Sequence, residues 1–162
     1  AVTINQGMRM RAWYDILQLG PGPEDEAGIR ESQRIVEGLI EAQAVPPERI
    51  VLAGFSQGGA IVLHTALRYP RRLAGVVALS TYVPLSTKLE SEKSAANEQL
   101  PIFMAHGQQD PIIPLHHATA SRDYLASLGY TIDWHLYPMA HEVCPPEIQD
   151  IRAWLLRVLE VD

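Results

Sequence analysis

Residues Gly54-Phe55-Ser56-Gln57-Gly58-Gly59 decide the fold of this chain. They stand between an apolar run at residues 50–53 and a segment at residues 57–69 that is apolar almost all round. This pattern predicts a buried strand that turns sharply into a buried helix. The six residues match G-x-S-x-G, a turn that presents a serine hydroxyl at the end of a strand. Taken alone, the motif leaves two alternatives open, a turn that binds a phosphate and a turn that binds nothing.

The geometry and chemistry of such a turn explain why glycine and serine stand at these positions. The backbone is so tight at the serine that side chains two residues away would clash, so we expect Gly54 and Gly58 to be required there. The turn also directs the first free amides of the helix toward a reacting carbonyl. The sequence therefore predicts Ser56 as the nucleophile and the Gln57 N–H as one oxyanion donor.

Outside the motif, short apolar runs alternate with longer helical patterns. This alternation predicts an α/β fold, a mostly parallel sheet with flanking helices, in one domain over residues 1–162. Four strands are expected at residues 50–53, 73–80, 102–105 and 131–137, the last at an edge. Four helices are expected at residues 24–43, 57–69, 114–128 and from residue 145 onward, with a polar surface excursion at 86–99.

A serine nucleophile needs a base, and the base needs an orienting acid. In the α/β arrangement that carries G-x-S-x-G, the chain order is serine, then acid, then histidine. Asp110 follows the predicted strand at 102–105, and His141 follows the one at 131–137. Because the carboxyl ends of parallel strands meet at one edge of a sheet, all three residues should converge there.

The other histidines fit this role less well. His64 lies on the predicted buried helix and suits packing, and His106 is expected to support the turn that carries the acid. His116 and His117 are neighbours on a helix, so we expect their rings to diverge and to form no metal site. His135 lies inside the edge strand, on its exposed face.

Two further rivals are weaker still. Asp15 precedes the serine, which is the wrong order for the acid. Cys144 could in principle pair with His141 as a nucleophile, but it lacks a sharp turn, and packing is the simpler interpretation. No Cys/His cluster has zinc spacing and no phosphate-binding glycine motif is present, so neither a metal nor a cofactor is expected.

Composition limits the partners. The chain of 162 residues has a net charge of -6, which argues against nucleic acid as a partner. No apolar segment is long enough to span a bilayer, so stable membrane insertion is not expected, and no signal peptide is visible. Cys144 is the single cysteine, which fits a reducing compartment and predicts a cytoplasmic location.

Several blocks resemble one family. Residues 12–15, 52–60, 78–82, 106–110 and 137–142 are similar to blocks of the carboxylesterase, acyl-protein thioesterase and lysophospholipase family of small α/β-hydrolases. The resemblance implies the α/β-hydrolase fold, hydrolysis of a small acyl ester or thioester through an acyl-enzyme, no metal and, in many members, a homodimer.

Within that family our first expectation is a serine carboxylesterase that acts on short-to-medium acyl esters. An acyl-protein thioesterase or lysophospholipase is the alternative, because the shape of the acyl pocket separates these activities. A binding module without catalysis is more remote, because binding alone does not require a complete triad. A dienelactone-type or C–C hydrolase is remoter still, since those enzymes usually carry cysteine where Ser56 stands.

One departure from the family pattern concerns the N-terminal side. Family members begin with two or three further strands and an H-G-x-G loop that supplies the second oxyanion N–H, and no such segment precedes Trp13. We therefore expect a sheet that is incomplete at its N-terminal side, with the strand ending at Ala53 unpaired along one edge. Half of the oxyanion hole would then be missing, which costs about 10²–10³ in rate.

Overall fold

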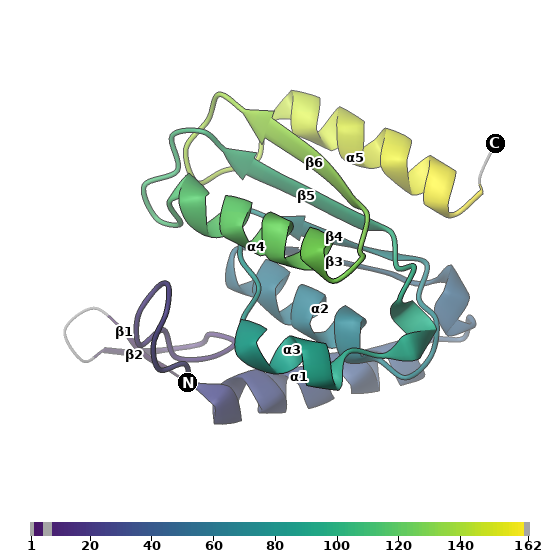
Figure 1. Ribbon diagram of the computed structural model, residues 1–162, viewed down its shortest axis with the longest axis horizontal. Helices are drawn as coiled ribbons and strands as arrows, with labels where there is room; N and C mark the ends of the chain where they lie inside the picture. Colours follow the sequence, from purple (N-terminus) through teal and green to yellow (C-terminus); the bar gives the residue numbers. More distant parts are fainter. Residues whose placement is uncertain (1, 5–7, 161–162) are drawn as a thin grey trace.

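A parallel four-stranded sheet forms the centre of the computed structural model, which describes residues 2–4 and 8–160. The strands lie in the order β3 (Val51–Phe55), β4 (Gly75–Leu79), β5 (Ile102–Gly107) and β6 (Ile132–Tyr137) (Figure 1). All three pairings are parallel, as the sequence predicted. The carboxyl ends of the four strands therefore share one edge of the sheet.

Helices cover both faces of this sheet (Figure 1). On one face α2 (Gln57–Arg68) and α4 (Leu115–Ser127) pack against the strands, and α1 (Glu26–Glu41) packs on α2. On the other face lies α5 (Pro145–Val158). None of the helices in the described part of the chain is long and apolar enough to cross a membrane.

Alternate strand residues divide the core into two clusters. Val76 and Met104 face the helices α2 and α4, where Ile61 and Leu125 complete a layer that water does not reach. Phe103 faces α5 instead, in a cluster whose other members are Val77, Leu79, Ala105, Tyr137, Met139 and Trp154. The central strands β4 and β5 are thus buried on both faces, which explains why they are mostly apolar, whereas the outer strands β3 and β6 are partly exposed.

The polar stretch at 86–99 lies mostly at the surface, as predicted, but it contains regular structure that the sequence did not predict. It folds into α3 (Ser86–Glu92) and a short 3-10 helix, η2 (Ala95–Asn97). Asn97 is buried, and its side chain accepts from the Leu73 N–H and donates to the carbonyls of Tyr69 and Arg71. Its polar groups therefore satisfy the chain between α2 and β4, a role that hydropathy cannot predict.

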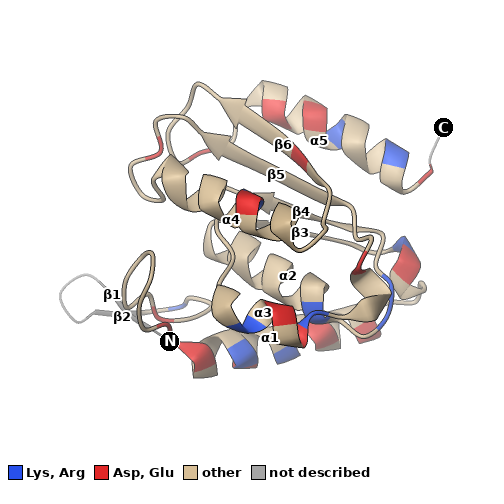
Figure 2. Cartoon of the chain, in the orientation of Figure 1, with Lys and Arg blue, Asp and Glu red and all other residues tan. Residues whose placement is uncertain are grey.

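Charged residues join α1, α2 and α3. Glu92 accepts hydrogen bonds from Arg30 and Arg68, and Glu26 is bonded to Arg30 and Lys88. Figure 2 shows acidic and basic positions interspersed along α1 and α3 at the bottom of the view. Arg68 is largely buried, so this network fixes α3 beside α1 and α2.

The N-terminal side contains an element that the sequence did not predict. The short strands β1 (Val2–Ile4) and β2 (Met8–Met10) form an antiparallel pair of their own and do not join the larger sheet. Within residues 2–4 and 8–160, β3 pairs with β4 alone and so lies at an edge of its sheet. The expectation of an unpaired side of β3 agrees with this arrangement. A last 3-10 turn, η1 (Pro47–Arg49), leads into β3.

Candidate active site

The turn from β3 into α2 carries the backbone strain that the motif predicts. Ser56 has φ 55° and ψ -121°, a conformation that costs a residue other than glycine about 1–3 kcal/mol. Its N–H donates to the Leu79 carbonyl at 2.8 Å, which ties the turn to β4. The hydroxyl makes no capping bond to α2, so Oγ is available for other partners.

The glycines of this turn are not equivalent. A Cβ at Gly54 would lie closer than 3.0 Å to the backbone of Gly58 and Gly59, so the predicted clash is present there. A Cβ at Gly58 would lie 3.5 Å from Trp13 Nε1, an ordinary contact, so the clash expected at this position is not found. The second tight approach is at Gly59, where a Cβ would lie 2.8 Å from Thr81 Cγ2. The sequence argument missed this position because much of the tightness comes from Thr81, which follows β4 and is distant in the sequence.

The three side chains selected from the sequence form one chain of hydrogen bonds. Ser56 Oγ lies 3.0 Å from His141 Nε2, and His141 Nδ1 lies 2.7 Å from Asp110 Oδ2. A carboxylate can only accept, so Nδ1 carries the proton and Nε2 is left to accept from the serine hydroxyl. The Asp110 side chain is fully buried, while that of His141 keeps about a sixth of its surface (17%) exposed. The arrangement joins a hydroxyl, an imidazole and a carboxylate in the order that nucleophilic catalysis requires.

The carboxylate of Asp110 is held from several sides. Its Oδ1 accepts from the amides of Ile112 and Ile113 at 2.8 and 2.9 Å, while Oδ2 accepts from His141. Burial raises the pKa of Asp110, but the hydrogen bonds from His141 and the two amides outweigh it, so the net pKa is lowered. Asp110 is therefore an anion at neutral pH, as an orienting acid must be.

The loop that carries His141 approaches β5 closely at Gly107. A Cβ there would lie closer than 3.0 Å to the carbonyls of Met139 and Ala140. The same Met139 carbonyl accepts from the Gln109 N–H at 3.1 Å, which links the loop to the residue before Asp110. Gly107 thus lets the histidine and its acid meet. The sequence analysis did not select it, although a glycine at the end of a buried strand was the available signal.

Gln57 has two roles of different kinds. Its N–H belongs to the first residue of α2 and so has no carbonyl partner within the helix, as the sequence predicted. Its side chain, which the sequence did not select, accepts from the Trp13 N–H at 3.2 Å and donates to the Tyr14 carbonyl at 2.8 Å. The side-chain amide of Gln57 therefore holds the Trp13–Tyr14 segment beside the turn through hydrogen bonds to its backbone.

The remaining histidines lie away from the serine. His64 is buried and bonded to Gln33, as expected for packing. His135 is bonded to Asp133 and stacks on Phe103, so it is half-buried where exposure was expected. The expectation that the rings of His116 and His117 diverge was wrong, because their centroids lie 4.1 Å apart. Their side-chain rotamers bring the rings together despite the different directions of the Cβ atoms.

The other rivals occupy structural places. Cys144 precedes α5 and packs beside the cluster around Phe103. The backbone N–H of Asp15 donates to Asp25, the residue that caps α1. Among the described residues, no group of three His, Cys, Asp or Glu side chains could hold a metal ion.

A buried carboxylate in α5 was not foreseen. Glu147 lies in the first turn of α5, fully buried, and neither carboxylate oxygen has a hydrogen-bond partner among the described residues. Burial raises its pKa to about 7. Alternating hydropathy could not reveal it, because Glu at the start of a helix usually faces solvent.

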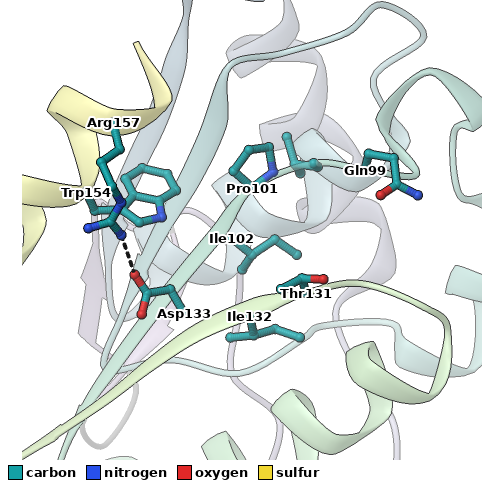
Figure 3. A pocket seen from close by; sticks show the side chains of 9 residues that line it. Gln99, Pro101, Ile102, Thr131, Ile132, Asp133, Trp154 and Arg157 are labelled. Atoms are coloured by element: carbon teal, nitrogen blue, oxygen red, sulfur yellow. Dashed lines mark hydrogen bonds and ion pairs between the residues drawn. The ribbon is translucent and has the colours of Figure 1, made fainter. Parts of the chain in front are cut away.

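Two cavities in the described part of the chain lie apart from the hydrogen-bonded side chains. A cavity of about 520 Å³ lies at the opposite edge of the sheet, between Pro101, Thr131 and the Asp133–Arg157 ion pair (Figure 3). A second, of about 410 Å³, is lined by Tyr82, His117 and Tyr124 among others. Neither lining includes Ser56, Asp110 or His141. These two cavities therefore do not mark the site, which is identified by the hydrogen bonds that join Ser56, His141 and Asp110.

A parallel sheet with helices on both faces, and a serine, histidine and carboxylate at its carboxyl edge, define the α/β-hydrolase class. Residues 1–159 match the Phospholipase/Carboxylesterase family over almost the whole chain, and the chain belongs to that family. It is 40% identical to acyl-protein thioesterase 1 of Mycosarcoma maydis, over 98% of this chain and 73% of that protein. The sequence-based resemblance and fold class are thereby confirmed.

Solved structures agree with this assignment. SOBER1 of Arabidopsis thaliana superposes with a TM-score of 0.89 at 32% identity, covering 98% of this chain and 79% of that one. Acyl-protein thioesterase 2 of Zea mays superposes with a TM-score of 0.85 at 26% identity, covering 94% and 74%. Membership of this family makes the chain a hydrolase of the esterase and thioesterase kind.

Proposed function

We propose that this chain hydrolyses acyl thioesters, through an acyl-enzyme formed on Ser56. The hydrogen-bonded chain Ser56–His141–Asp110 is the observation that carries the proposal. The relatives named acyl-protein thioesterase favour a thioester over the short-chain carboxylester that the sequence first suggested.

The first half of the reaction forms the acyl-enzyme. Ser56 Oγ attacks the carbonyl carbon of the thioester as His141 Nε2 takes the hydroxyl proton. Asp110 stabilises the resulting imidazolium, since its buried carboxylate already accepts from Nδ1. The Gln57 N–H donates to the oxyanion. The C–S bond then breaks, and the departing sulfur takes the proton from Nε2.

The second half releases the acid. Water gives a proton to His141 Nε2 as its oxygen attacks the acyl carbon, and the bond from that carbon to Ser56 Oγ breaks. The proton returns to Oγ, so the protein ends as it began and one water is consumed. No metal or cofactor takes part in either half.

Exposed apolar side chains support an acyl substrate. Phe55 precedes the nucleophile, Ile112 lies two residues beyond Asp110, and Val143 lies two residues beyond His141, and all three are exposed. Phe55 also contacts the His141 ring, with 4.8 Å between centroids. Apolar surface at the mouth of a polar site is what a hydrocarbon chain requires.

Carboxylester hydrolysis is the second candidate function. The same steps cleave a C–O bond, and esterase PE8 superposes on this chain with a TM-score of 0.78 at 25% identity. A binding module without catalysis is disfavoured, because binding needs no imidazole bonded to a serine.

A substrate series tests the proposal. The purified protein and its Ser56→Ala variant are compared on thioesters of increasing acyl length, from acetyl to palmitoyl, and on matched p-nitrophenyl esters. We expect the thioesters to give the higher kcat/KM and Ser56→Ala to lower it roughly 10⁴-fold or more on every substrate. Retained activity in the variant would overturn the role of Ser56. A preference for acetyl esters would instead restore the short-chain carboxylesterase.

A further inference from the structure

His106 connects the end of β5 to the turn that holds the acid. It is fully buried, and its Nε2 lies 2.7 Å from the Ile113 carbonyl and 3.5 Å from Asp110 Oδ2. A carbonyl only accepts, so Nε2 must carry a proton and donate it. The ring therefore braces both ends of the turn whose amides bind the Asp110 carboxylate.

The other ring nitrogen of His106 needs a donor. In the neutral ring with a proton on Nε2, Nδ1 is an acceptor, and it is buried without a partner among the described residues. Leaving a buried acceptor unpaired costs about 1–3 kcal/mol, and buried polar groups are nearly always satisfied. A hydrogen-bond donor therefore belongs beside Nδ1.

Ser80 is placed to supply that donor. Leu79 pairs with Ala105, and the Ser80 N–H donates to the Ala105 carbonyl at 2.9 Å, so residue 80 adjoins residue 106 across the strands. Ser80 is fully buried, and its hydroxyl is likewise unpartnered among the described residues. Its φ of 52° is left-handed, a strain that the surrounding structure must hold in place.

The neighbouring hydroxyl is a poorer choice. Thr81 Oγ1 is also buried and unpartnered, but its Cγ2 faces Gly59 at the start of α2, on the side of the nucleophile turn. Ser80 is thus the hydroxyl nearest in register to the unsatisfied ring nitrogen of His106.

We propose that His106 is a positioning residue for Asp110, fixed in its Nε2–H tautomer by a hydrogen bond that one buried water relays from the Ser80 hydroxyl to Nδ1. This proposal rests on the function proposed for Ser56, because positioning Asp110 matters only if His141 is the base. Ser80 follows Leu79, whose carbonyl binds the Ser56 N–H. The end of β4 therefore supports the nucleophile and the acid together.

His64 provides a matched control for this proposal. It is equally buried, it bonds through Nε2 to Gln33 Oε1 at 2.8 Å, and its Nδ1 is also unpartnered among the described residues. It lies on α2 against α1, away from the acid turn. The two histidines are thus equally buried, but His106 contacts the turn that carries Asp110, whereas His64 contacts Gln33 on α1.

The kinetic test compares two replacements at each histidine. His106→Gln keeps a nitrogen donor near Ile113, while His106→Leu keeps only bulk. We expect His106→Leu to lower kcat about 10- to 100-fold with KM unchanged, and His106→Gln to recover most of it, because small misplacements of a catalytic group are costly. His64→Gln and His64→Leu should leave kcat within about 3-fold of the parent, because neither replacement should displace Asp110.

Nitrogen NMR of labelled ring nitrogens supplies a readout that needs no turnover. We expect His106 to show a protonated Nε2 and a hydrogen-bonded Nδ1. Ser80→Ala should move the Nδ1 resonance to lower field, and Thr81→Val should leave it in place. The downfield proton of the Asp110–His141 hydrogen bond should weaken in His106→Leu and persist in His64→Leu.

Opposite results would overturn the proposal. A proton on Nδ1 of His106, or equal kcat in His106→Leu and the parent, contradicts it. If His106→Leu does not fold, the proposal is tested by two NMR results: the tautomer of His106 in the unmodified protein and the shift of its Nδ1 resonance in Ser80→Ala. If the unmodified protein hydrolyses no ester or thioester, the proposed function fails, while the NMR results still decide the link between Ser80 and His106.

Discussion

Within residues 2–4 and 8–160 there are two hydrogen-bonded Asp–His pairs, and their surroundings differ. Asp110 bonds to His141 at 2.7 Å, with the carboxylate buried and two backbone amides on its other oxygen. Asp133 bonds to His135 at 2.9 Å, but its side chain is about a third exposed (36%) and it also pairs with Arg157. The first imidazole reaches a serine, whereas the second stacks on Phe103 and lies 3.6 Å from the carboxylate of Asp150.

The difference shows what makes a pair useful for catalysis. An imidazole flanked by two carboxylates has no group to activate, and an arginine offsets the charge of its acid. The pair at the carboxyl edge has a buried anion on one side and a hydroxyl on the other, so a proton can move in one direction. Proximity of aspartate and histidine is common to both and therefore does not identify the site.

The sharpest way to break this comparison is to neutralise each acid. We expect Asp110→Asn to lower kcat about 10⁴-fold, because an amide cannot hold the required tautomer or stabilise the imidazolium. Asp133→Asn, the matched control, should leave kcat nearly unchanged. Steady-state hydrolysis of a thioester by both variants measures the contrast, and equal losses would show that the two pairs had been wrongly distinguished.

Gly107 tests whether the first pair depends on a close approach of two loops. Gly107→Ala places a methyl group against the carbonyls of Met139 and Ala140, which should push His141 away from Asp110. We expect kcat/KM to fall about 10²-fold or more, since displacement by about 1 Å is enough. Gly38→Ala is the control, because nothing lies within 4 Å of a Cβ there. Wild-type activity in Gly107→Ala would mean that the loop simply yields.

Glu147, which lies on the same helix as Asp150, should make the stability of the protein depend on pH. Because burial raises its pKa from 4.5 to about 7, the folded state binds this proton more tightly than the unfolded chain. The resulting stability is complete below about pH 4.5, declines as pH rises and is lost above about pH 7. We expect the free energy of unfolding to fall by about 2–3 kcal/mol across this window.

Glu147→Gln removes the titration and keeps the shape. Urea unfolding at a series of pH values should show a flatter profile for this variant between pH 4.5 and 7. An unchanged slope would place the titrating group elsewhere.

The smallest effect on stability is expected when Arg157, the partner of Asp133, is replaced. Arg157 is mostly exposed, and its bond to Asp133 spans 3.1 Å. Exposed ion pairs contribute about 0–1 kcal/mol, so Arg157→Ala should change the unfolding free energy by less than about 1 kcal/mol and leave turnover intact. A loss of activity would connect the cavity in Figure 3 to the reaction.

The sequence predicted the converging side chains because strand direction alone determines where they emerge. Ser56, Asp110 and His141 each follow an apolar run, and parallel pairing puts such positions at one edge. The order along the chain of these four strands and of the four long helices followed from the alternation of short apolar runs and helical patterns.

The supporting contacts could not be predicted, because they depend on how closely separate segments approach. Gly107 matters only through the loop at 139–140, and the Gln57 side chain only through Trp13 and Tyr14. Asn97 looks like a surface residue by composition, yet it is buried because three backbone groups need its amide. Hydropathy records the polarity of a side chain and not the partners that satisfy it.

The central claim is that Ser56 is the nucleophile, and covalent labelling tests it most directly. A fluorophosphonate probe is applied to the protein, and the modified residue is located by peptide mass spectrometry. We expect a single adduct on Ser56, absent from Ser56→Ala and much slower to form in Asp110→Asn. An adduct on another residue, such as Cys144, or undiminished labelling of Ser56→Ala would contradict the account.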